Sequence, residues 1–195
     1  LVANEYYTYD KIDSTLHAWQ NDYGFSTHPF FSDYGIIYNL DTIGYSSQSN
    51  LPIFAVKLSD NANIDEDESR VLILGQCHAE EIYGVEIAMA IIECFINPNT
   101  CYQNEYIKAE LENYLSYSLY NIELWIVPTH NPEGLKVVHG YNDLEGNEIK
   151  DPSYRKNLRD ANSNNTFLEN IDWKYGVGFD EDGVDLNRNY DVNWI

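Results

Sequence analysis

The chain is 195 residues long, and its 32 acidic residues outnumber its 11 Lys and Arg residues, which gives a formal net charge of −21. A surface this acidic disfavours nucleic acid and anionic membranes as partners, because both attract positive charge. The apolar content of 44% is typical of a globular chain, and no apolar run approaches the roughly 20 residues that span a bilayer. We therefore expect a single domain over residues 1–195 with a substantial core.

Apolar periodicity and turn residues predict the elements in chain order. We interpret the acidic stretch between the second and third strands as a solvated loop. The expected elements are a helix over 9–21 with Asp10 as its N-cap, strands over 35–45 and 52–59, the acidic loop over 60–69, a strand over 71–77, helices over 80–96 and 104–119, a strand over 122–127, and a loop-rich remainder after Asn131.

The order strand, helix, helix, strand predicts an α/β fold with a mixed central β-sheet flanked by helices. The continuous apolar run at 71–77 is typical of a strand covered on both faces. Ligand sites of such sheets gather at the carboxyl ends of strands. His78 follows one such end and the segment 129–134 follows another, so we expect these two segments to meet.

The three cysteines form no CxxC pair. Cys77 follows an apolar strand and Cys94 lies in an apolar helical pattern, so we expect both to be core thiols. A bridge between Cys94 and Cys101 is an alternative that the spacing does not decide, and the redox compartment stays open.

His78 and Glu81 form the first candidate site. At the start of a helix, positions i and i+3 share a face, so the imidazole and the carboxylate can reach one ion. Zinc accepts nitrogen and oxygen ligands, and a hydrolytic zinc has three protein ligands and a water. The structural alternative is a capping His with a Glu that the helix N-terminus stabilises.

Two later segments hold cations that stand out in so acidic a chain. The first, YRKNLR, contains Arg155, and the second, GVDLNRNY, contains Asn187 and Arg188. A guanidinium is a forked, permanently charged donor that matches a carboxylate, and an adjacent amide adds a neutral donor. Taken singly, either segment is as readily a surface salt-bridge set.

The ordered segments GQCHAEEIYG, PTHNPEG, YRKN and GVDLNRNY together resemble the zinc carboxypeptidase family, the metallopeptidases typified by the pancreatic carboxypeptidases. The resemblance extends over nearly the whole chain. It implies that His78 and Glu81 are two ligands of a Zn²⁺ ion. It also implies that Asp185 accepts a hydrogen bond from the other ring nitrogen of His78 and fixes its tautomer.

The resemblance implies roles for the cationic segments as well. Arg155 would polarise the scissile carbonyl and stabilise the oxyanion. Asn187 and Arg188 would hold the terminal carboxylate of the substrate, which restricts cleavage to the last residue of a peptide.

The sequence departs from the family pattern in two places. Glu80 stands where the family usually has an Arg; we interpret it as facing solvent, the alternative being an altered subsite. The family's third zinc ligand, a His, and its general-base Glu lie downstream of the NRN segment, and neither follows Ile195 here. We therefore expect the N-terminal portion of a catalytic domain, truncated before the last strands of the sheet and with an exposed apolar edge. His130 and His139 lie near the predicted site, but we assign neither as a replacement ligand.

The function expected from this resemblance is zinc-dependent hydrolysis of the C-terminal peptide bond, with the C-termini of peptides or proteins as substrates and a monomeric enzyme. A non-catalytic peptide-binding module would keep the carboxylate clamp without the metal. A zinc amidohydrolase of small N-acyl amino acids or cell-wall peptides would keep both. The missing initiating Met favours a secreted protein, with a cytoplasmic location as the alternative.

Overall fold

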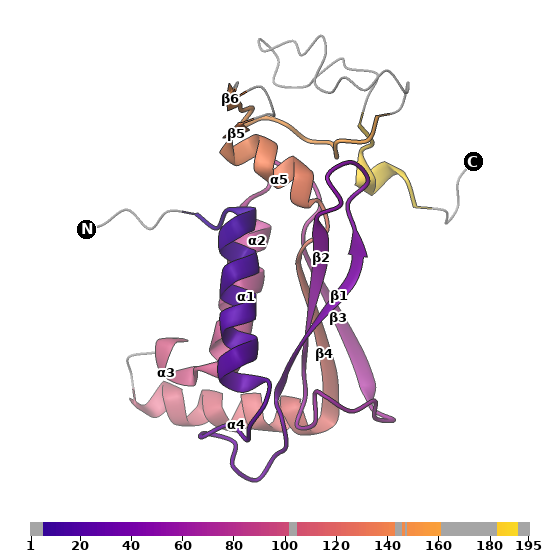
Figure 1. Cartoon of the computed structure of the whole chain (residues 1–195). Helices are drawn as coiled ribbons and strands as arrows, with labels where there is room; N and C mark the ends of the chain where they lie inside the picture. The colour runs from indigo at the N-terminus through magenta and orange to yellow at the C-terminus, as the bar shows by residue number, and fades with distance from the viewer. Residues whose placement is uncertain (1–5, 102–104, 143–145, 147, 161–182, 191–195) are drawn as a thin grey trace.

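The computed structural model describes residues 6–101, 105–142, 146, 148–160 and 183–190 (Figure 1). Its elements follow the predicted order of helices and strands. The helices are α1 (Tyr9–Tyr23), α2 (Tyr83–Ile96), α3 (Pro98–Cys101), α4 (Glu105–Asn121), α5 (Pro132–His139) and the 3-10 turn η1 (Leu186–Arg188), and the strands are β1 (Tyr38–Tyr45), β2 (Pro52–Leu58), β3 (Ser69–Gln76), β4 (Ile122–Thr129), β5 (Tyr141–Asn142) and β6 (Glu148–Ile149).

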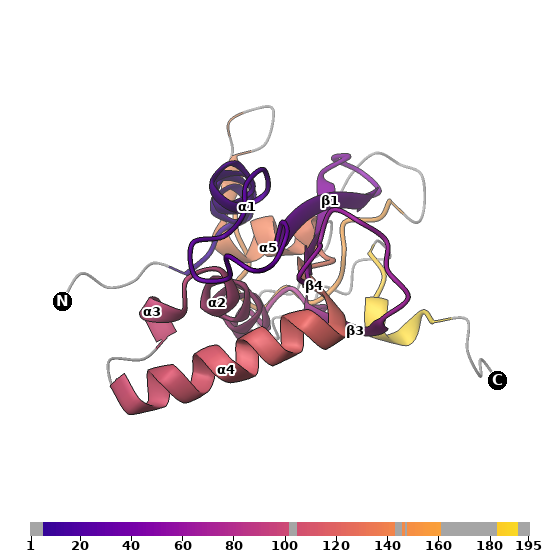
Figure 2. The same cartoon turned by 90° about the horizontal axis from the view of Figure 1, so that it is seen from below.

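The central sheet is mixed, as predicted. Its strand order is β1-β2-β4-β3, and β5 and β6 form a separate two-stranded pair. The β1–β2 and β2–β4 pairings are antiparallel, whereas β3 runs parallel to β4. A parallel pair needs a crossover connection, which α2, α3 and α4 supply here. In both views α1 and α2 lie on one side of the strands (Figures 1 and 2).

The main core fills the layer between these helices and the sheet. The stripe of Ile12 and Leu16 on α1 and the apolar face of α2 pack against β2 and β4, and all of these side chains are buried. A second, smaller cluster around Ala79, Val137 and Tyr154 lies under the loops at the carboxyl ends of β3 and β4. That second cluster supports the segments that hold the predicted site residues. No helix in the described ranges is long and apolar enough to cross a membrane.

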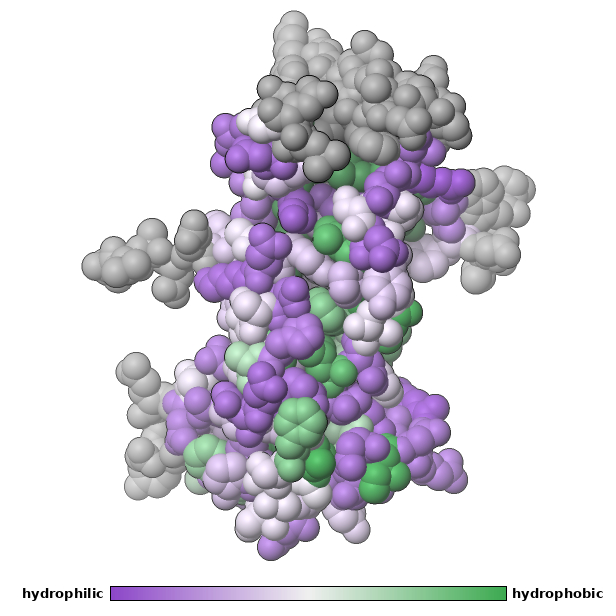
Figure 3. Space-filling model, in the orientation of Figure 1, coloured by the Kyte–Doolittle hydropathy of each residue, from purple (hydrophilic) through white to green (hydrophobic). Residues whose placement is uncertain are grey.

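Strand β3 differs from expectation. The apolar run predicted burial on both faces, but Val71, Leu72 and Leu74 are 41%, 61% and 46% exposed. Within the described residues β3 pairs with β4 alone, so its other edge has no partner there. On the face that Figure 3 displays, apolar residues lie at the surface among hydrophilic ones. An open apolar edge of this kind promotes association unless another segment covers it.

Three element boundaries differ from the predictions. Thr8, rather than Asp10, caps α1, because its hydroxyl accepts from the Lys11 amide at 3.2 Å. Helix α2 begins at Tyr83, so His78 and Glu81 lie in the turn before the helix and not within it. The loop-rich stretch after Asn131 contains α5.

The sequence-based expectation for Cys94 is also wrong. Cys94 is bonded to Cys101, with the two Cα atoms 5.6 Å apart, and only Cys77 is free. The bridge closes a short loop from α2 through α3, which limits the freedom of the unfolded chain in this region.

This bridge predicts the thiol count of the unfolded protein. One thiol, that of Cys77, should react with an alkylating reagent in denaturant without reductant, and all three should react after reduction. Mass spectrometry of the alkylated protein gives both counts. Three labels before reduction would contradict the bridge.

A buried ion network lies at the amino end of β4. Glu123 is fully buried; its carboxylate accepts from Lys57 Nζ at 2.6 Å, from Arg70 Nε at 2.7 Å and from the Glu66 amide at 3.1 Å. Burial raises the pKa of Glu123, but these hydrogen bonds outweigh it and hold the pKa at about 2. Through Glu66 the network ties down part of the acidic loop, which is therefore packed more closely than a solvated loop.

Glu123→Gln should lower the free energy of unfolding by about 3 kcal/mol at neutral pH, because it leaves the buried Lys57 without its counter-charge. The folded pKa of about 2 lies below the unfolded value of roughly 4.3, so the network stabilises the fold fully above that value. Its contribution is lost as the pH falls through about 2. Denaturant unfolding at several pH values measures the free energy of unfolding of both proteins. The difference between the two free energies should become smaller as the pH falls toward 2.

Glu110→Gln is the matched control, because Glu110 is exposed on α4 and carries the same charge. Its free energy of unfolding should follow that of the unaltered protein at every pH. A Glu123→Gln difference that stays constant down to acid pH would contradict the network's role.

Candidate functional site

The predicted site begins where β3 and β4 end together. Gln76 and Thr129 are paired in the parallel ladder, and the Thr129 hydroxyl donates to Gln76 Oε1 at 2.5 Å. Gln76 Nε2 in turn donates to the carbonyl of Ala79 at 2.7 Å, which fixes the turn that carries His78. A Cβ at Gly75 would lie 2.3 Å from the Pro128 carbonyl oxygen, so this close approach of the two strands requires glycine. The two segments that we expected to meet, those after β3 and β4, therefore do lie together at the carboxyl ends of these strands.

Asn131 joins three segments of the site. Asn131 is 1% exposed. Its side-chain nitrogen Nδ2 donates to the backbone carbonyls of Cys77 at 3.1 Å and Lys156 at 3.0 Å. Its side-chain oxygen accepts from the Gly134 amide at 3.1 Å and thereby caps α5. Asn131 has no predicted role from the sequence, although an Asn followed by Pro after a strand is a helix-start signal.

Asn157 attaches the last described segment to the same framework. Its backbone nitrogen donates to the Val184 carbonyl at 3.1 Å, and its side-chain oxygen accepts from the Val184 amide at 2.8 Å. Gly183 has a φ of +75°, and a Cβ there would lie 2.5 Å from the Asn157 carbonyl oxygen. The glycine therefore permits the close approach that brings Asp185 to the strand ends.

Four of the predicted site residues contact one another. His78 Nδ1 lies 3.1 Å from Glu81 Oε1, and His78 Nε2 lies 3.1 Å from Asp185 Oδ1. Arg155 donates from Nε to Asp185 Oδ2 at 2.9 Å, and its Nη2 lies 2.6 Å from His78 Nε2. The backbone carbonyl of Arg155 also accepts from the Ala79 amide at 3.1 Å. Residues more than 100 positions apart in the sequence thus form one cluster.

The His78 ring can satisfy these neighbours in two alternative ways. With its proton on Nε2 it donates to Asp185 and leaves the Nδ1 lone pair facing Glu81. With its proton on Nδ1 it accepts from Arg155 at Nε2, and the Nδ1 proton, although 3.1 Å from Glu81 Oε1, makes no hydrogen bond to a described residue. One ring nitrogen cannot donate to Asp185 and accept from Arg155 at once, so a ligand that needs the Nδ1 lone pair would select the first tautomer.

The cluster is strongly polarised. Burial raises the pKa of Asp185, but hydrogen bonds and charge from Arg155 and His78 outweigh it and hold the pKa below its usual value. The hydrogen bond to Asp185 raises the pKa of Arg155 above its usual value, so its guanidinium stays charged. Asp185 is therefore a carboxylate that accepts from both groups.

The donors present fit a divalent metal at His78 and Glu81. His78 is 5% exposed, and its Nδ1 atom is buried and makes no hydrogen bond to a described residue, which is costly for a polar atom. A facing carboxylate 3.1 Å away suits two ligands of one ion. The cluster holds three carboxylates and one guanidinium, those of Glu80, Glu81, Asp185 and Arg155, so two negative charges remain for a cation to balance.

Asn187 and Arg188 lie in η1, immediately after Asp185. The Asn187 amide donates to Asp185 Oδ1 at 3.0 Å, so the turn starts from the same carboxylate that holds His78 and Arg155. Both side chains are exposed, and Arg188 Nη1 donates to the Asn187 carbonyl at 3.1 Å. The turn is therefore tied to the cluster while its side chains remain open to a ligand.

Glu80 does not face solvent, in contrast to our interpretation of the sequence. Its Oε1 accepts from Arg155 Nη1 at 3.1 Å, and its side chain is 29% exposed. The charged partner comes from a loop 75 residues away, so no local pattern could have indicated it.

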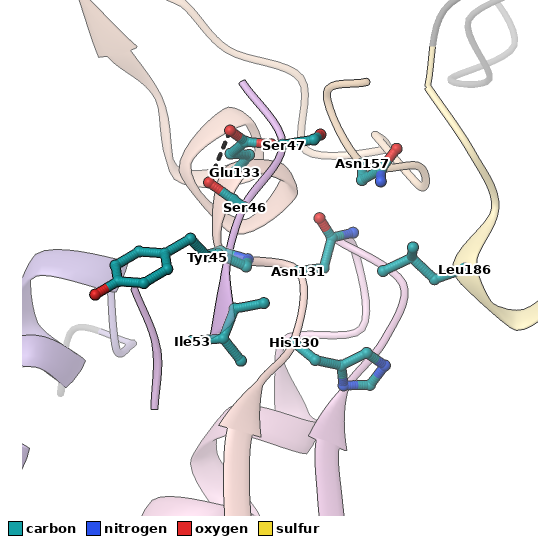
Figure 4. A pocket seen from close by; sticks show the side chains of 10 residues that line it. Tyr45, Ser46, Ser47, Ile53, His130, Asn131, Glu133, Asn157 and Leu186 are labelled. Carbon is teal, nitrogen blue, oxygen red and sulfur yellow. Dashed lines mark hydrogen bonds between the residues drawn. The ribbon is translucent and has the colours of Figure 1, made fainter. Parts of the chain in front are cut away.

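A hollow of about 190 Å³ lies beside Asn131 and Asn157, the residues that join the segments of the site (Figure 4). Glu133, 2% exposed, closes one side by accepting from the Ser46 hydroxyl at 2.8 Å and so ties the β1–β2 loop to α5. His130 lies at the opposite wall near Leu186, and its ring nitrogens make no hydrogen bond to a described residue. Burial, followed by the charge of His78, lowers the pKa of His130.

A different group of possible metal ligands lies at the other end of the sheet. Asp60, Glu66 and Glu68 place one carboxylate oxygen each within 4.8 Å of one another. This group adjoins Glu123 at the amino end of β4 and does not include the predicted ligands. It is a half-buried acidic cluster and not part of the site at His78.

Comparison with known proteins bears on the whole arrangement. The family model described as zinc carboxypeptidase matches residues 30–195. A curated zinc carboxypeptidase from Saccharothrix mutabilis subsp. capreolus is 26% identical over 163 residues, which are 84% of this chain and 30% of that protein.

Solved structures of the same kind share the fold. Carboxypeptidase A from Helicoverpa armigera superimposes with a TM-score of 0.63 at 18% identity, over 97% of this chain and 35% of that one. Thrombin-activatable fibrinolysis inhibitor gives a TM-score of 0.62 at 18% identity, over 96% of this chain and 35% of that one. The chain thus spans about a third of the length of these relatives.

The family match covers most of the chain, and the shared fold agrees with it. The resemblance inferred from the four sequence segments is confirmed: this chain belongs to the zinc carboxypeptidase family.

Proposed function

We propose that the chain contributes the metal-binding and carboxylate-binding part of a zinc-dependent exopeptidase that hydrolyses the C-terminal peptide bond of its substrates. One observation carries the proposal. His78, Glu81, Arg155 and Asp185 come from three separate segments and meet within hydrogen-bonding distance at the carboxyl ends of β3 and β4. Family membership supports the same class of reaction.

His78, through Nδ1, and Glu81 are the zinc ligands in this proposal. When bound, the ion would supply Lewis acidity to the scissile carbonyl and lower the pKa of a bound water. Asp185 holds the proton of His78 on Nε2 and orients the ring, so that Nδ1 is free to coordinate. The buried Nδ1 atom without a hydrogen-bond partner among the described residues supports this role.

Arg155 stabilises the negative charge that develops on the carbonyl oxygen. Asp185 and Glu80 hold its guanidinium through Nε and Nη1, which leaves one N–H on Nη1 and two on Nη2 for other partners. A charge fixed in this way needs no reorganisation during the reaction.

Asn187 and Arg188 bind the substrate's terminal carboxylate. They follow Asp185 by two and three residues and their side chains are exposed, so the carboxylate would lie next to the reacting bond. A guanidinium and an amide together provide charge and directed hydrogen bonds for it. This clamp limits the reaction to the last residue of a chain.

His78 and Glu81 are two ligands where a hydrolytic zinc has three. We assign the remaining ligand and the general base to other parts of the whole protein, because this chain spans about a third of its relatives' length. The Cys94–Cys101 bridge supports export to an oxidising compartment.

The natural full-length protein should contain about one zinc per chain and release single residues from peptides with a free C-terminal carboxylate. A chelator should abolish this activity, and added zinc should restore it. The same peptides with a C-terminal amide should react roughly 100-fold more slowly, because the charged hydrogen bonds to Arg188 and Asn187 are lost. Chelator-resistant cleavage, or equal rates on both peptide forms, would sink the proposal.

Alanine variants of the two arginines should separate their roles. Arg155→Ala should lower kcat by roughly 100- to 1,000-fold with little change in KM, because its charge acts mainly in the transition state. Arg188→Ala should instead raise KM by roughly 10- to 100-fold, because it binds the ground state as well. Steady-state kinetics on one peptide series measures both.

Arg159→Ala is the matched control for both variants. Arg159 lies four residues after Arg155 and is exposed, so its loss removes the same charge without touching the cluster. It should leave kcat and KM close to their original values. If Arg155→Ala acts on KM and Arg188→Ala on kcat, the two roles are wrongly assigned.

A further inference from the structure

Glu80 lies between the two proposed metal ligands, next to the group that faces the reacting carbonyl. Its Oε1 accepts from Arg155 Nη1 at 3.1 Å, whereas Asp185 accepts from Arg155 Nε on another part of the same guanidinium. The guanidinium thus separates Glu80 from Asp185 and from the turn that begins there with Asn187. The contacts therefore lead from Asp185 to Arg155 and from Arg155 to Glu80.

The second oxygen of Glu80 is unused by the described residues. Glu80 Oε2 is buried and has no hydrogen-bond partner among them. The side chain as a whole is 29% exposed, so rotation of the carboxylate can present either oxygen to a molecule in the site. A buried carboxylate oxygen without a donor costs free energy that an incoming N–H group would recover.

Charge at this position also favours a cationic partner. Glu80, Glu81 and Asp185 outnumber Arg155 within the cluster, and the whole chain carries −21. A divalent ion would balance the cluster, so the remaining attraction comes from the Glu80 carboxylate at its edge and from the charge of the whole chain. The field of so acidic a protein attracts positively charged peptides and repels acidic ones.

We propose that Glu80 determines substrate specificity by binding a positively charged or hydrogen-bond-donating side chain in the residue that precedes the scissile bond. This inference rests on the proposed function, in which Asn187 and Arg188 hold the residue after that bond. The residue before it then lies on the Glu80 side of Arg155. Peptides with Lys or Arg at this position are the favoured substrates, and peptides with Asp or Glu are disfavoured.

The test uses the natural full-length protein and three peptides that differ only in the residue before the scissile bond, which is Lys, Ala or Glu. The kcat/KM ratio of the Lys peptide to the Glu peptide should be roughly tenfold, since attraction and repulsion at a partly exposed site each contribute modestly. High salt should reduce the ratio. Glu80→Gln should bring it close to one, Glu80→Lys should invert it, and Glu80→Asp should retain the preference.

Glu110→Gln is the matched control. It removes an equal charge from α4, which Figure 1 shows at the end of the molecule opposite η1, and the ratio should stay unchanged. If Glu80 only positions Arg155, Glu80→Gln will change kcat for all three peptides by one factor and leave their ratio intact. That result would overturn the inference.

Equilibrium binding separates this inference from the proposed function. Calorimetry with non-cleavable analogues of the three peptides should show the same preference for Lys over Glu, and Glu80→Gln should remove it. Preferential binding without any hydrolysis would refute the exopeptidase and leave the role of Glu80 standing. Hydrolysis or binding that is indifferent to the Lys-to-Glu exchange, or no binding at all, would refute the role of Glu80.

Discussion

The parallel pairing of β3 with β4 is the constraint on which the site depends. It aligns Gln76 with Thr129, so the two strands end at the same edge of the sheet. The loops that follow them therefore begin side by side. Asn131 then converts this alignment into a fixed geometry, because one buried side chain bonds to both loops and to the segment of Lys156. A buried amide with three partners has few alternatives, since each broken bond would leave a backbone group unsatisfied. The site is thus positioned by backbone contacts before any catalytic side chain is considered.

Much of this arrangement is predictable from the sequence. The order of the main elements, the mixed sheet and the meeting of loops at the strand ends follow from apolar periodicity and from general rules for α/β sheets. The residues of the cluster lie in three of the four ordered segments that resemble the zinc carboxypeptidase family, and their expected roles follow from that resemblance. Helix α5 has a local signal as well, since Asn131 is an N-cap residue and Pro132 follows it at the start of the helix, but the Gly-, Asn- and Asp-rich stretch around it predicts a loop.

Other features depend on contacts that no local pattern encodes. The partner of Glu80 lies 75 residues away, and the partners of Glu123 come from β2, from β3 and from the acidic loop. The exposure of Val71 and Leu72 is of the same kind, since an apolar run specifies a strand but not what covers it. Cys94 likewise fits an apolar helical face until the fold brings Cys101 to it.

His78 is the residue of the cluster whose hydrogen bonds can change. Arg155 and Asp185 both contact His78 Nε2, but this nitrogen can either accept from Arg155 or donate to Asp185, not both at once. In the proposed metal site, a cation at Nδ1 would resolve this competition, because the ring proton would then lie on Nε2, where Asp185 accepts it. Arg155 would lose its contact with the ring and stay held by Asp185 and Glu80 through its other nitrogens. The proposed metal binding and the orientation of the guanidinium would therefore be coupled through a single imidazole, and the two carboxylates that flank Arg155 would act electrostatically on the metal site as well.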